Sequence, residues 1–510
     1  MTELPDWCEP LLDAPQMRAV DRWAIEQQGI PSLDLMERAG QGVARAVEEL
    51  APDGPVVVVC GKGNNGGDGF VVARLLREAA RDVTVVCVAA GEEELSPDAR
   101  ASLERLPGSA PLALSDGAAA EAIAHAHVIV DALLGTGFSG VAHGGVAEAI
   151  AAIGDAPGLV LSVDMPSGVD ASTGVVAGPA ITAAKTVTFH AAKPGLWIHP
   201  GKGHAGEVDT VDIGIPRGAP GTSDSGLIRD DVLDTLPSRE PGSTKFSSGH
   251  VVVVGGSRGL MGAPAMASLA ALRAGAGYVT ACVPAALQQI LDMQLLEVMT
   301  LGLADEDGAL TPEALSAVKG LLARGGCLAL GPGLGRGPQS VRFARDLARE
   351  APLALVLDAD GLNAHVGSLA GLVTRAAPTV LTPHAGELAR LLGIDSEEVQ
   401  SERLAHARQA ADQAQAIVVL KGDDTLVVEP AGRVAISRGN SPALATAGTG
   451  DVLTGTLAAL LAQGMEPFAA AAAAVQLHAQ AGRDAARKQG AAEGVIAGDV
   501  IAALPAARRR

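Results

Sequence analysis

The chain contains the stretch Val56-Val57-Val58-Val59-Cys60-Gly61-Lys62-Gly63-Asn64-Asn65-Gly66-Gly67-Asp68-Gly69, in which an apolar run passes directly into a glycine-rich turn. A short, continuous apolar run is typical of a strand that is buried on both faces. Glycines let the backbone approach an anion, and a helix that begins just beyond the turn points its free N–H groups at that anion. The stretch therefore predicts a buried strand and a phosphate-binding turn, followed by a helix that starts near Phe70.

Apolar runs of the same kind recur through the first half of the chain and alternate with helical stretches. They cover residues 83–88, 128–130, 159–163 and 186–189, and two helices within about residues 15–50 precede the series. Helices between buried strands indicate right-handed βαβ crossovers. The first half is therefore expected to form a doubly wound, Rossmann-like α/β domain.

The same alternation restarts in the second half, after a stretch rich in Gly, Pro and Ser. The later apolar runs cover residues 251–254, 279–283, 328–330, 353–357, 380–382, 417–420 and 426–428. A chain of 510 residues also exceeds what one hydrophobic core usually supports. We expect a first domain over residues 1–215, a linker over residues 216–226 and a second doubly wound α/β domain over residues 227–510.

The composition of the chain argues against several classes of partner. The net charge is −20 and the pI is near 4.9, whereas binding to the phosphate backbone of a nucleic acid needs a basic surface. No uninterrupted apolar run approaches the roughly 18 residues of a membrane span, and the N-terminus has no signal-peptide pattern. The five cysteines show no CxxC spacing. These features predict a cytoplasmic protein that binds neither nucleic acid nor membrane.

The glycine-rich turn of the first half satisfies the dinucleotide-binding pattern G-x-G-x-x-G through Gly61, Gly63 and Gly66. The next predicted strand, however, has no carboxylate at its end that could hold a ribose hydroxyl. This difference argues against a standard NAD dehydrogenase. The polar side chains of Asn65 and Asp68 inside the turn favour a site that makes further contacts to a ligand or an ion.

Two more loops of the first half carry carboxylates at strand ends. Asp131 follows the run 128–130, and Asp164 follows the run 159–163. Each aspartate alone fits equally well as a turn or helix N-cap residue. In an open α/β sheet, however, the loops at the carboxyl ends of strands converge on one crevice. Three such loops in succession therefore favour a site shared by Asn65, Asp68, Asp131 and Asp164.

The motifs of this half together resemble the NAD(P)H-hydrate epimerase family over about residues 15–213. They are Asn64-Asn65-Gly66-Gly67-Asp68-Gly69, Asp131-Ala132-Leu133-Leu134-Gly135-Thr136-Gly137, Asp164-Met165-Pro166-Ser167-Gly168 and Lys193-Pro194-Gly195. The resemblance implies a pocket for hydrated NADH or NADPH, with Asp164 at the nicotinamide end. It also implies a potassium ion held by Asn65, Asp131 and Ser167. The implied pocket residues are Asn64, Asn65, Gly66, Gly67, Asp68, Gly135, Thr136, Gly137, Phe138, Ser139, Gly140 and Val141.

Proton transfer at the hydrated ring carbon needs an acid and a base. We expect Lys185, near the start of the strand 186–189, to pair with Asp164 as the second catalytic group of the epimerase site. A carboxylate and an ammonium on either side of the hydrated ring would each shift the pKa of the other.

The second half has a different glycine-rich turn, Thr446-Ala447-Gly448-Thr449-Gly450-Asp451, which opens a predicted helix over residues 452–462. The N–H groups at the start of that helix would face a bound anion, and Asp451 would lie beside it. An anion hole with an adjacent base is suited to phosphoryl transfer, because it stabilises the transferring group while the base takes a proton from the attacking hydroxyl. Asp451 could otherwise be a simple helix N-terminal carboxylate.

Residues 227–505 resemble the ribokinase-like fold and, more narrowly, the ADP/ATP-dependent NAD(P)H-hydrate dehydratase family. The motifs that carry this resemblance are Gly259-Leu260-Met261-Gly262-Ala263-Pro264, Gly331-Pro332-Gly333-Leu334-Gly335, Asp358-Ala359-Asp360-Gly361-Leu362-Asn363 and Thr382-Pro383-His384-Ala385-Gly386-Glu387. The resemblance implies that Ala263, Gly335, His384 and Asp451 contact hydrated NAD(P)H. It implies magnesium on the phosphates and an adenine nucleotide held by Lys421, Gly422, Asp423, Asp424, Thr425 and Gly450.

The two resemblances together imply a bifunctional repair enzyme. Its first domain would interconvert the R and S hydrates, and its second would dehydrate the S form with ADP, giving AMP and phosphate. Two alternatives remain open from the sequence. One is a kinase of the hydroxymethylpyrimidine or pyridoxal type with an accessory N-terminal domain, and the other makes the N-terminal half a non-catalytic binding module. The resemblance also implies a homo-oligomer, and it leaves the choice between ADP and ATP open.

Overall fold

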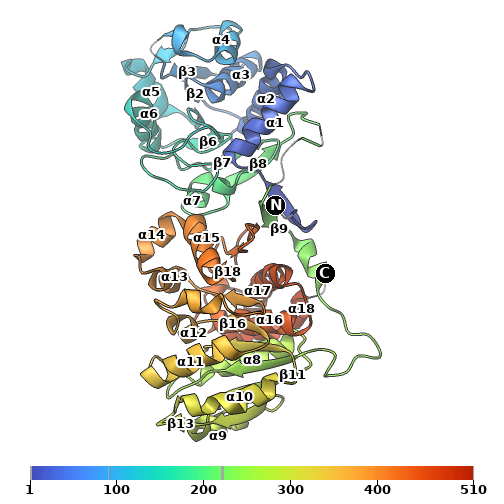
Figure 1. Cartoon of the computed structure of the whole chain (residues 1–510). Coiled ribbons are helices and arrows are strands. Elements are labelled where there is room, and N and C mark those ends of the chain that lie inside the picture. The colour runs from blue at the N-terminus through green and yellow to red at the C-terminus, as the bar shows by residue number, and fades with distance from the viewer. Residues whose placement is uncertain (1–2, 90, 217, 220–222, 509–510) are drawn as a thin grey trace. The chain divides into compact units, whose positions relative to one another are not determined.

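The computed structural model describes residues 3–89, 91–216, 218–219 and 223–508, which form two compact units (Figure 1). One unit comprises Pro10–Ser225, and the other joins Met1–Glu9 to Gly226–Arg510. Of the predicted linker, residues 217 and 220–222 lie outside the described residues. The last residues of that linker begin a strand, β9 (Ser225–Ile228).

The unit Pro10–Ser225 is built on a seven-stranded sheet whose strands are all parallel. This topology confirms the predicted parallel α/β sheet, because each of the five predicted apolar runs is a strand. The order is β4 (Leu112–Ala113), β3 (Val83–Cys87), β2 (Val56–Cys60), β5 (Val128–Ala132), β6 (Leu159–Val163), β7 (Lys185–Phe189) and β8 (Glu207–Val211).

Helices cover both faces of this sheet, so the unit is doubly wound as predicted. One face packs against α1 (Ala14–Glu26), α2 (Ser32–Leu50), α3 (Asn64–Glu78) and α4 (Pro97–Glu104). The other packs against α5 (Gly117–His125) and α6 (Gly144–Gly154). Along β2, Val56 and Val58 belong to the first core and Val57 and Val59 to the second. Strict alternation between two apolar layers explains why this strand is a continuous valine run.

Helix α3 begins at Asn64, six residues before the predicted start near Phe70. The reason is close packing inside its first two turns. A Cβ added to Gly66 would lie 2.1 Å from the carbonyl oxygen of Gly61, and one added to Gly69 would lie 2.7 Å from the Cβ of Ala132. These glycines therefore let α3 pack closely against β2 and β5. The helix opens with the N–H groups of the residues that start at Asn64, not with those at Phe70.

The second unit contains an eleven-stranded mixed sheet. Seven neighbouring strands are parallel, and β19 runs antiparallel to its neighbours β18 and β20. The order is β1 (Cys8–Leu11), β9, β20 (Val434–Ile436), β19 (Leu426–Val428), β18 (Ile417–Leu420), β17 (Thr379–Leu381), β16 (Ala354–Leu357), β15 (Cys327–Leu330), β10 (His250–Val254), β11 (Tyr278–Pro284) and β12 (Met299–Leu303).

One face of this sheet packs against α8 (Gly262–Arg273), α16 (Thr449–Ala462), α17 (Pro467–Gln489) and α18 (Ala497–Ala507). Val251 and Val253 of β10 belong to that core, whereas Val252 and Val254 are fully buried on the opposite face. Both faces are therefore covered, as the sequence predicts. The remaining elements are α9 (Gln288–Gln294), β13 (Asp305–Glu306), β14 (Ala309–Leu310), α10 (Leu315–Leu322), α11 (Pro338–Glu350), α12 (Asp360–Asn363), α13 (Ala385–Leu392), α14 (Ser396–Ser401), α15 (Arg403–Ala414) and, in the first unit, α7 (Lys202–Ala205).

Residues 3–9 belong to the second unit, although the sequence predicted them as part of the first domain. Strand β1 extends the eleven-stranded sheet beside β9. Trp7 is 7% exposed and its ring lies 5.9 Å from that of Phe468, while Glu9 forms an ion pair with Arg438. Edge-strand pairing and burial of an indole ring hold this segment on a sheet that is formed by residues much later in the chain.

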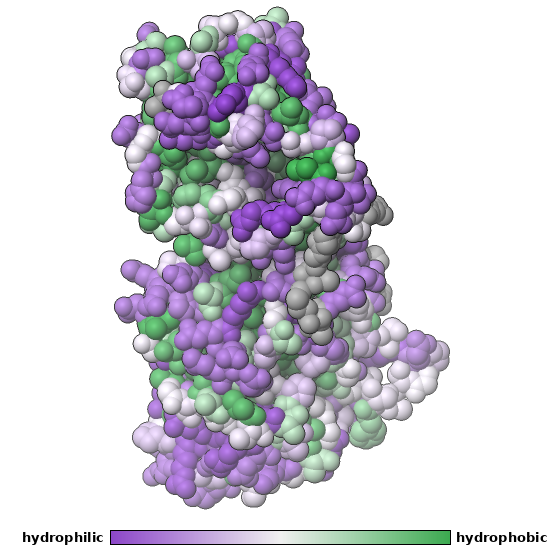
Figure 2. Space-filling model, turned by 45° about the horizontal axis from the view of Figure 1, so that its top comes forward, coloured by the Kyte–Doolittle hydropathy of each residue, from purple (hydrophilic) through white to green (hydrophobic). Residues whose placement is uncertain are grey.

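Hydrophilic side chains are spread over the face of the molecule seen in Figure 2, with smaller hydrophobic patches between them. Within the described residues, we find no helix that is both long enough and apolar enough to cross a membrane.

Candidate active sites

The first unit has a cavity of about 750 Å³ at the carboxyl ends of its strands. Its wall includes the start of α3, the loop after β5, Asp164 after β6 and Lys193 after β7. The crossover connections bring these segments together, since parallel strands end at the same edge of the sheet. The residues of the wall that were predicted from the sequence are Asn64, Asn65, Asp68, Gly135, Thr136, Gly137, Phe138, Ser139 and Asp164.

Asp164 is held in an uncommon backbone conformation, with φ +67°. Its Oδ2 accepts hydrogen bonds from Thr136, at 2.8 Å from N–H and 2.6 Å from the hydroxyl, and its Oδ1 accepts one at 2.7 Å from Lys193 Nζ. Burial alone would raise the pKa of Asp164, but the Lys193 ammonium and these hydrogen bonds lower it below its usual value. A strained, ionised carboxylate facing a cavity is typical of a functional site.

The predicted pairing of Lys185 with Asp164 is wrong. Lys185 is the first residue of β7 and its Nζ lies 2.6 Å from Asp209 on the neighbouring β8, whereas Asp164 follows the carboxyl end of β6. The two residues therefore lie at opposite ends of the sheet. Lys193 takes the place of the predicted partner, and its side chain has no exposure to solvent. The sequence signal for Lys193 was its position in the loop after β7, at the same edge as Asp164.

Asp131 is fully buried at the end of β5. Its carboxylate accepts hydrogen bonds from the N–H and hydroxyl of Ser167, at 2.9 and 2.6 Å, and from the Ser162 hydroxyl at 2.9 Å. Burial raises its pKa, although these hydrogen bonds act in the opposite direction. Among the described residues no ion pair compensates its charge. The amide nitrogen of Asn65 is also buried without a hydrogen-bond partner in that part of the chain.

Two other carboxyls of the cavity wall have raised pKa values. Burial, followed by the charge of Asp164, raises the pKa of Asp68 well above its usual value. Asp21 of α1, which no sequence motif singled out, has its pKa raised to about 6 by burial and by Asp164, partly offset by Lys193. The cavity thus places one ionised carboxylate next to two that hold protons more strongly.

Some predicted pocket residues lie outside the cavity wall. Gly66 and Gly67 pack inside α3 against Gly61 and Met36, and Val141 is 42% exposed beyond the loop that contains Phe138. Gly140 is likewise not part of the wall.

The second unit has a cavity of about 480 Å³ formed by the loop after β18, the segment around Asn440 and the start of α16. It is lined by the predicted nucleotide-binding residues Lys421, Gly422, Asp423, Thr425 and Gly450. Asp424 is not part of the wall, because its buried carboxylate is paired with Arg403 at 2.9 Å. This ion pair fixes the loop through a residue that lies outside the cavity wall.

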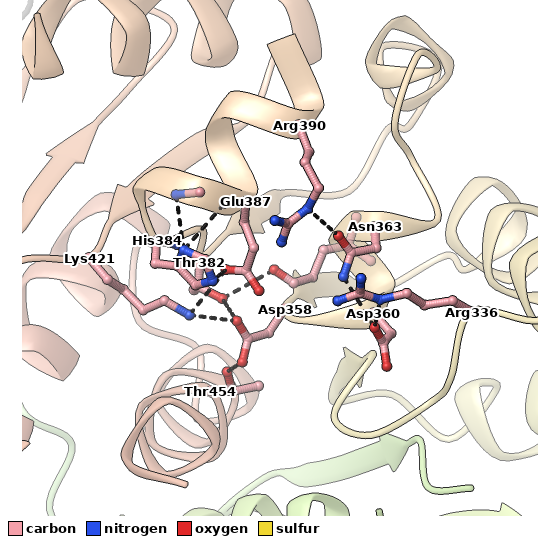
Figure 3. A network of polar contacts seen from close by, with 12 residues as sticks. Arg336, Asp358, Asp360, Asn363, Thr382, His384, Glu387, Arg390, Lys421 and Thr454 are labelled. Carbon is pink, nitrogen blue, oxygen red and sulfur yellow. Dashed lines mark hydrogen bonds and ion pairs between the residues drawn. The ribbon is translucent and has the colours of Figure 1, made fainter. Parts of the chain in front are cut away.

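Figure 3 shows a polar network at the carboxyl ends of β16, β17 and β18, with Asp358 at its centre. Asp358 accepts hydrogen bonds from Thr382 and Lys421, both at 2.9 Å, and from Thr454 at 2.7 Å. Lys421 Nζ also lies 3.7 Å from Glu387. Burial lowers the pKa of Lys421, but the charges of Asp358 and Glu387 outweigh it and raise the pKa. The network fixes a positive charge at the wall of the cavity.

Asp451 lies in the first turn of α16, which begins at Thr449 after Gly448. The backbone of Gly448 has φ +90°, a conformation that favours glycine. Burial and, to a smaller extent, the charge of Asp358 raise the pKa of Asp451 to about 7, whereas the charge of Lys421 acts to lower it. A carboxyl with a pKa near neutrality at a helix N-terminus is suited to general base catalysis.

His384 and Gly335 lie at the same edge of the sheet. His384 caps α13, where its Nδ1 accepts hydrogen bonds from the N–H groups of Gly386 and Glu387, at 3.0 and 3.3 Å. Burial lowers the pKa of His384. Because Nδ1 accepts two hydrogen bonds, the proton of the neutral ring lies on Nε2. Gly335 donates its N–H to Asp360 at 3.0 Å. Ala263 is half-buried near the start of α8, against the loop that contains Gly333.

Family models match both halves of the chain. Residues 251–506 match the model described as NAD(P)H-hydrate dehydratase, and residues 32–195 match the model described as YjeF-related protein N-terminus. Among curated proteins, the bifunctional NAD(P)H-hydrate repair enzyme of Moorella thermoacetica is 41% identical over 97% of this chain and 96% of its own length. That of Salinibacter ruber is 39% identical, over 98% and 96%.

Solved structures were also found that are similar to part of this chain. An ADP/ATP-dependent NAD(P)H-hydrate dehydratase from Bacillus subtilis, co-crystallised with ATP and Mg²⁺, is 28% identical and covers 55% of this chain and 96% of its own, with a TM-score of 0.46. A ribokinase-like superfamily protein from Enterococcus faecalis is 26% identical over 56% and 96%, with a TM-score of 0.48.

Two doubly wound units, each with a cavity and shifted carboxyl pKa values at the carboxyl ends of its strands, define an α/β enzyme with two sites. The full-length similarity then identifies the kind of enzyme. The chain belongs to the family of bifunctional NAD(P)H-hydrate repair enzymes.

Proposed function

We propose that the chain repairs hydrated NADH and NADPH in two steps, each carried out by one unit. The unit Pro10–Ser225 interconverts the R and S hydrates, and the unit containing Gly226–Arg510 dehydrates the S hydrate with ADP, giving AMP and phosphate. The observation that carries the proposal is Asp451, a carboxyl with a pKa of about 7 at the N-terminus of α16 beside the Lys421 cavity.

In the dehydration, Asp451 takes the proton of the hydroxyl at C6 of the hydrated ring, and the oxygen attacks the terminal phosphate of the nucleotide. The N–H groups that open α16 and the Lys421 ammonium stabilise the negative charge on the transferring group. The ring nitrogen then expels the phosphate from C6, and loss of a proton from C5 restores the reduced ring. Hydroxide is a poor leaving group, so phosphorylation supplies a better one.

A nucleotide in the cavity of about 480 Å³ would contact Lys421, Gly422, Asp423, Thr425 and Gly450. Magnesium bound to its phosphates would offset their negative charge. Asp424 would not contact the nucleotide directly. Its ion pair with Arg403 fixes the loop that carries the other contacts.

In the epimerisation, Asp164 faces the hydrated ring from the wall of the first cavity, and Lys193 holds its carboxylate in place. Thr136 orients the carboxylate through two hydrogen bonds, and Lys193 keeps it ionised. Asp164 takes the proton of the C6 hydroxyl as the C6–N1 bond breaks to give an aldehyde, and it returns that proton when N1 attacks the other face of the C6 carbonyl.

The residues predicted for potassium are compatible with a monovalent cation. Asp131 is a buried carboxylate that has no compensating ion pair among the described residues, Ser167 supplies an adjacent hydroxyl, and the amide oxygen of Asn65 would be the third ligand. Oxygen donors of this kind suit a hard cation. Potassium held by Asn65, Asp131 and Ser167 would neutralise Asp131 and fix the loop that carries Gly135 and Thr136.

The proposed setting is the cytoplasm, where hydrated coenzymes and ADP are both available and where the five free cysteines would stay reduced. A homo-oligomer remains a prediction from the family resemblance.

The test is to incubate the protein with a mixture of R and S hydrates, ADP and magnesium, and to follow the absorbance of NADH. Wild type is expected to convert both hydrates completely. Asp164→Ala is expected to convert the S form and leave the R form, with only slow spontaneous loss. Consumption of ATP with a vitamin-like alcohol, without any reaction of the hydrates, would reject the proposal in favour of a kinase.

A further inference from the structure

Two exposed arginines of the second unit are linked through the carboxylate of Asp360 and the amide of Asn363. Arg336 Nε donates to Asp360 Oδ1 at 2.9 Å, and Asn363 Nδ2 donates to the same oxygen at 3.1 Å. Arg390 Nε then donates to Asn363 Oδ1 at 3.0 Å. In Figure 3 the two arginine side chains come from different elements and converge on Asp360 and Asn363. The amide of Asn363, bonded at both ends, thus fixes one arginine relative to the other.

This arrangement leaves donors free to bind an anion. A guanidinium group has five N–H donors, and each arginine uses only Nε here. No hydrogen bond from their Nη atoms occurs within the described part of the chain. Asp360 is fully engaged, because its second oxygen accepts the N–H of Gly335. Arg336 is paired with Asp360, whereas Arg390 is bonded only to the neutral amide of Asn363. The group therefore has a net positive charge of about one, in a chain whose net charge is −20.

The pair lies next to the residues predicted to contact the hydrated dinucleotide. Arg336 directly follows Gly335, and Arg390 lies on α13, which His384 caps. Arg390 Nη1 is 3.8 Å from the position that a Cβ on Gly386 would take, so its side chain reaches back to the first turn of α13. Neither arginine lines the cavity around Lys421. An anion on this pair therefore belongs to the ligand at Gly335 and His384 and not to the nucleotide.

We propose that Arg336 and Arg390 form a phosphate-binding subsite that holds a phosphate group of the hydrated dinucleotide during dehydration. The fork of an arginine matches a phosphate in a bidentate manner, and two linked forks match it better than a point charge. Both hydrates carry a pyrophosphate, and only the NADPH form carries a 2′-phosphate. The subsite rests on the proposed dehydratase function, for which it would supply binding energy remote from the reacting carbon.

The experiment measures dehydration of the S hydrates of NADH and NADPH by wild type, Arg336→Gln, Arg390→Gln and the double variant. The control is Arg342→Gln on α11, whose side chain is 74% exposed and whose nearest acidic oxygen is 3.9 Å away. We expect KM for the hydrate to rise about 10-fold in each single variant and further in the double variant. The value of kcat and the KM for ADP are expected to stay within about 2-fold of wild type.

The two substrates identify which phosphate is bound. A rise in KM for the NADPH hydrate alone indicates the 2′-phosphate, and equal rises for both hydrates indicate the pyrophosphate. Variants that match Arg342→Gln with both hydrates, or that raise the KM for ADP instead, would overturn the subsite. Circular dichroism spectra and melting temperatures equal to those of the control show that the variants are folded.

A binding measurement keeps the subsite testable apart from the reaction. NADH and NADPH carry the same phosphates as their hydrates, so titration of their fluorescence reports the subsite without turnover. Failure of wild type to dehydrate either hydrate would reject the proposed function. Weaker coenzyme binding by the double variant would still support the phosphate subsite, and unchanged binding would reject it.

Discussion

Lys193 donates a hydrogen bond of 2.7 Å to Asp164 from a side chain that has no exposure to solvent. It also donates to Thr188 at 2.6 Å and to the carbonyl of Phe189 at 3.2 Å, so its ammonium is fully bonded. A buried ion pair of this kind is costly to break, because the remaining charge is left without a partner. The position of Asp164 in the cavity and its ionised state therefore both depend on Lys193.

Replacement of Lys193 by methionine is expected to destabilise the first unit by about 3 to 5 kcal/mol and to abolish most of the epimerisation. Thermal unfolding and the conversion of the R hydrate measure the two effects. Lys185→Met is the matched control, since Lys185 pairs with the half-exposed Asp209 at the other end of the sheet. A loss of epimerisation in Lys185→Met that equals the loss in Lys193→Met would contradict this assignment.

Gly66 and Gly63 provide a second pair of variants. A Cβ on Gly66 would lie 2.1 Å from a backbone oxygen, whereas one on Gly63 would meet nothing within 4 Å. Gly66→Ala is expected to cost about 1 to 3 kcal/mol or more and to displace the start of α3, whereas Gly63→Ala should change stability by less than about 0.5 kcal/mol. Urea unfolding followed by the loss of helix measures both. Equal stability of the two variants would show that α3 does not pack as described.

The pKa of Asp451 makes the stability of the second unit depend on pH. Burial raises this pKa from 3.8 to about 7, so between these values the folded state holds a proton that the unfolded state has lost. Stability associated with this group is present at low pH and is lost as pH rises toward 7. Asp451→Asn should therefore gain roughly 1 to 3 kcal/mol relative to wild type between pH 5 and pH 8. Thermal unfolding at both pH values measures this gain, and a constant difference would contradict the assigned pKa.

Trp7 tests the membership of the first residues in the second unit. Trp7→Ala is expected to destabilise that unit by about 3 to 5 kcal/mol, because a buried ring next to Phe468 is removed. Heat inactivation of the dehydratase should then occur at a lower temperature, while heat inactivation of the epimerase stays the same. Trp7→Phe keeps an aromatic contact, so the temperature at which its dehydratase is inactivated should lie between those of Trp7→Ala and wild type. If Trp7→Ala lowered the inactivation temperature of the epimerase alone, the assignment of Trp7 to the second unit would be contradicted.

The sequence predicted the strands that are buried on both faces, because a short, continuous apolar run such as Val56–Cys60 between turn residues is typical of such a strand. It missed β8, in which Glu207, Asp209 and Thr210 are polar and the strand is only partly buried at the sheet edge. It also missed the pairing of β1 with β9, since nothing local to Cys8–Leu11 specifies a partner more than 200 residues away.

For the candidate sites, too, the sequence predicted some residues and missed others. Asp131, Asp164 and Asp451 were predicted because each follows a strand or a glycine-rich turn, and the structure places each at the carboxyl edge of a sheet. The choice of Lys185 as a partner failed because Lys185 precedes the predicted run 186–189 and therefore lies at the amino end of that strand, whereas Asp164 follows the carboxyl end of its own strand. Lys193 lies in the loop after β7, and only the folded chain shows that it reaches Asp164.

The most direct test of the account is the rate at which Asp451→Asn restores NADH from its S hydrate with ADP and magnesium. Asparagine keeps the shape of the side chain but cannot accept the hydroxyl proton as a carboxylate does. We predict a rate about 10² to 10⁴ times lower than that of wild type, with epimerisation of the R hydrate unchanged. Restoration of NADH at the wild-type rate would contradict the role of Asp451 as the base that activates the hydroxyl.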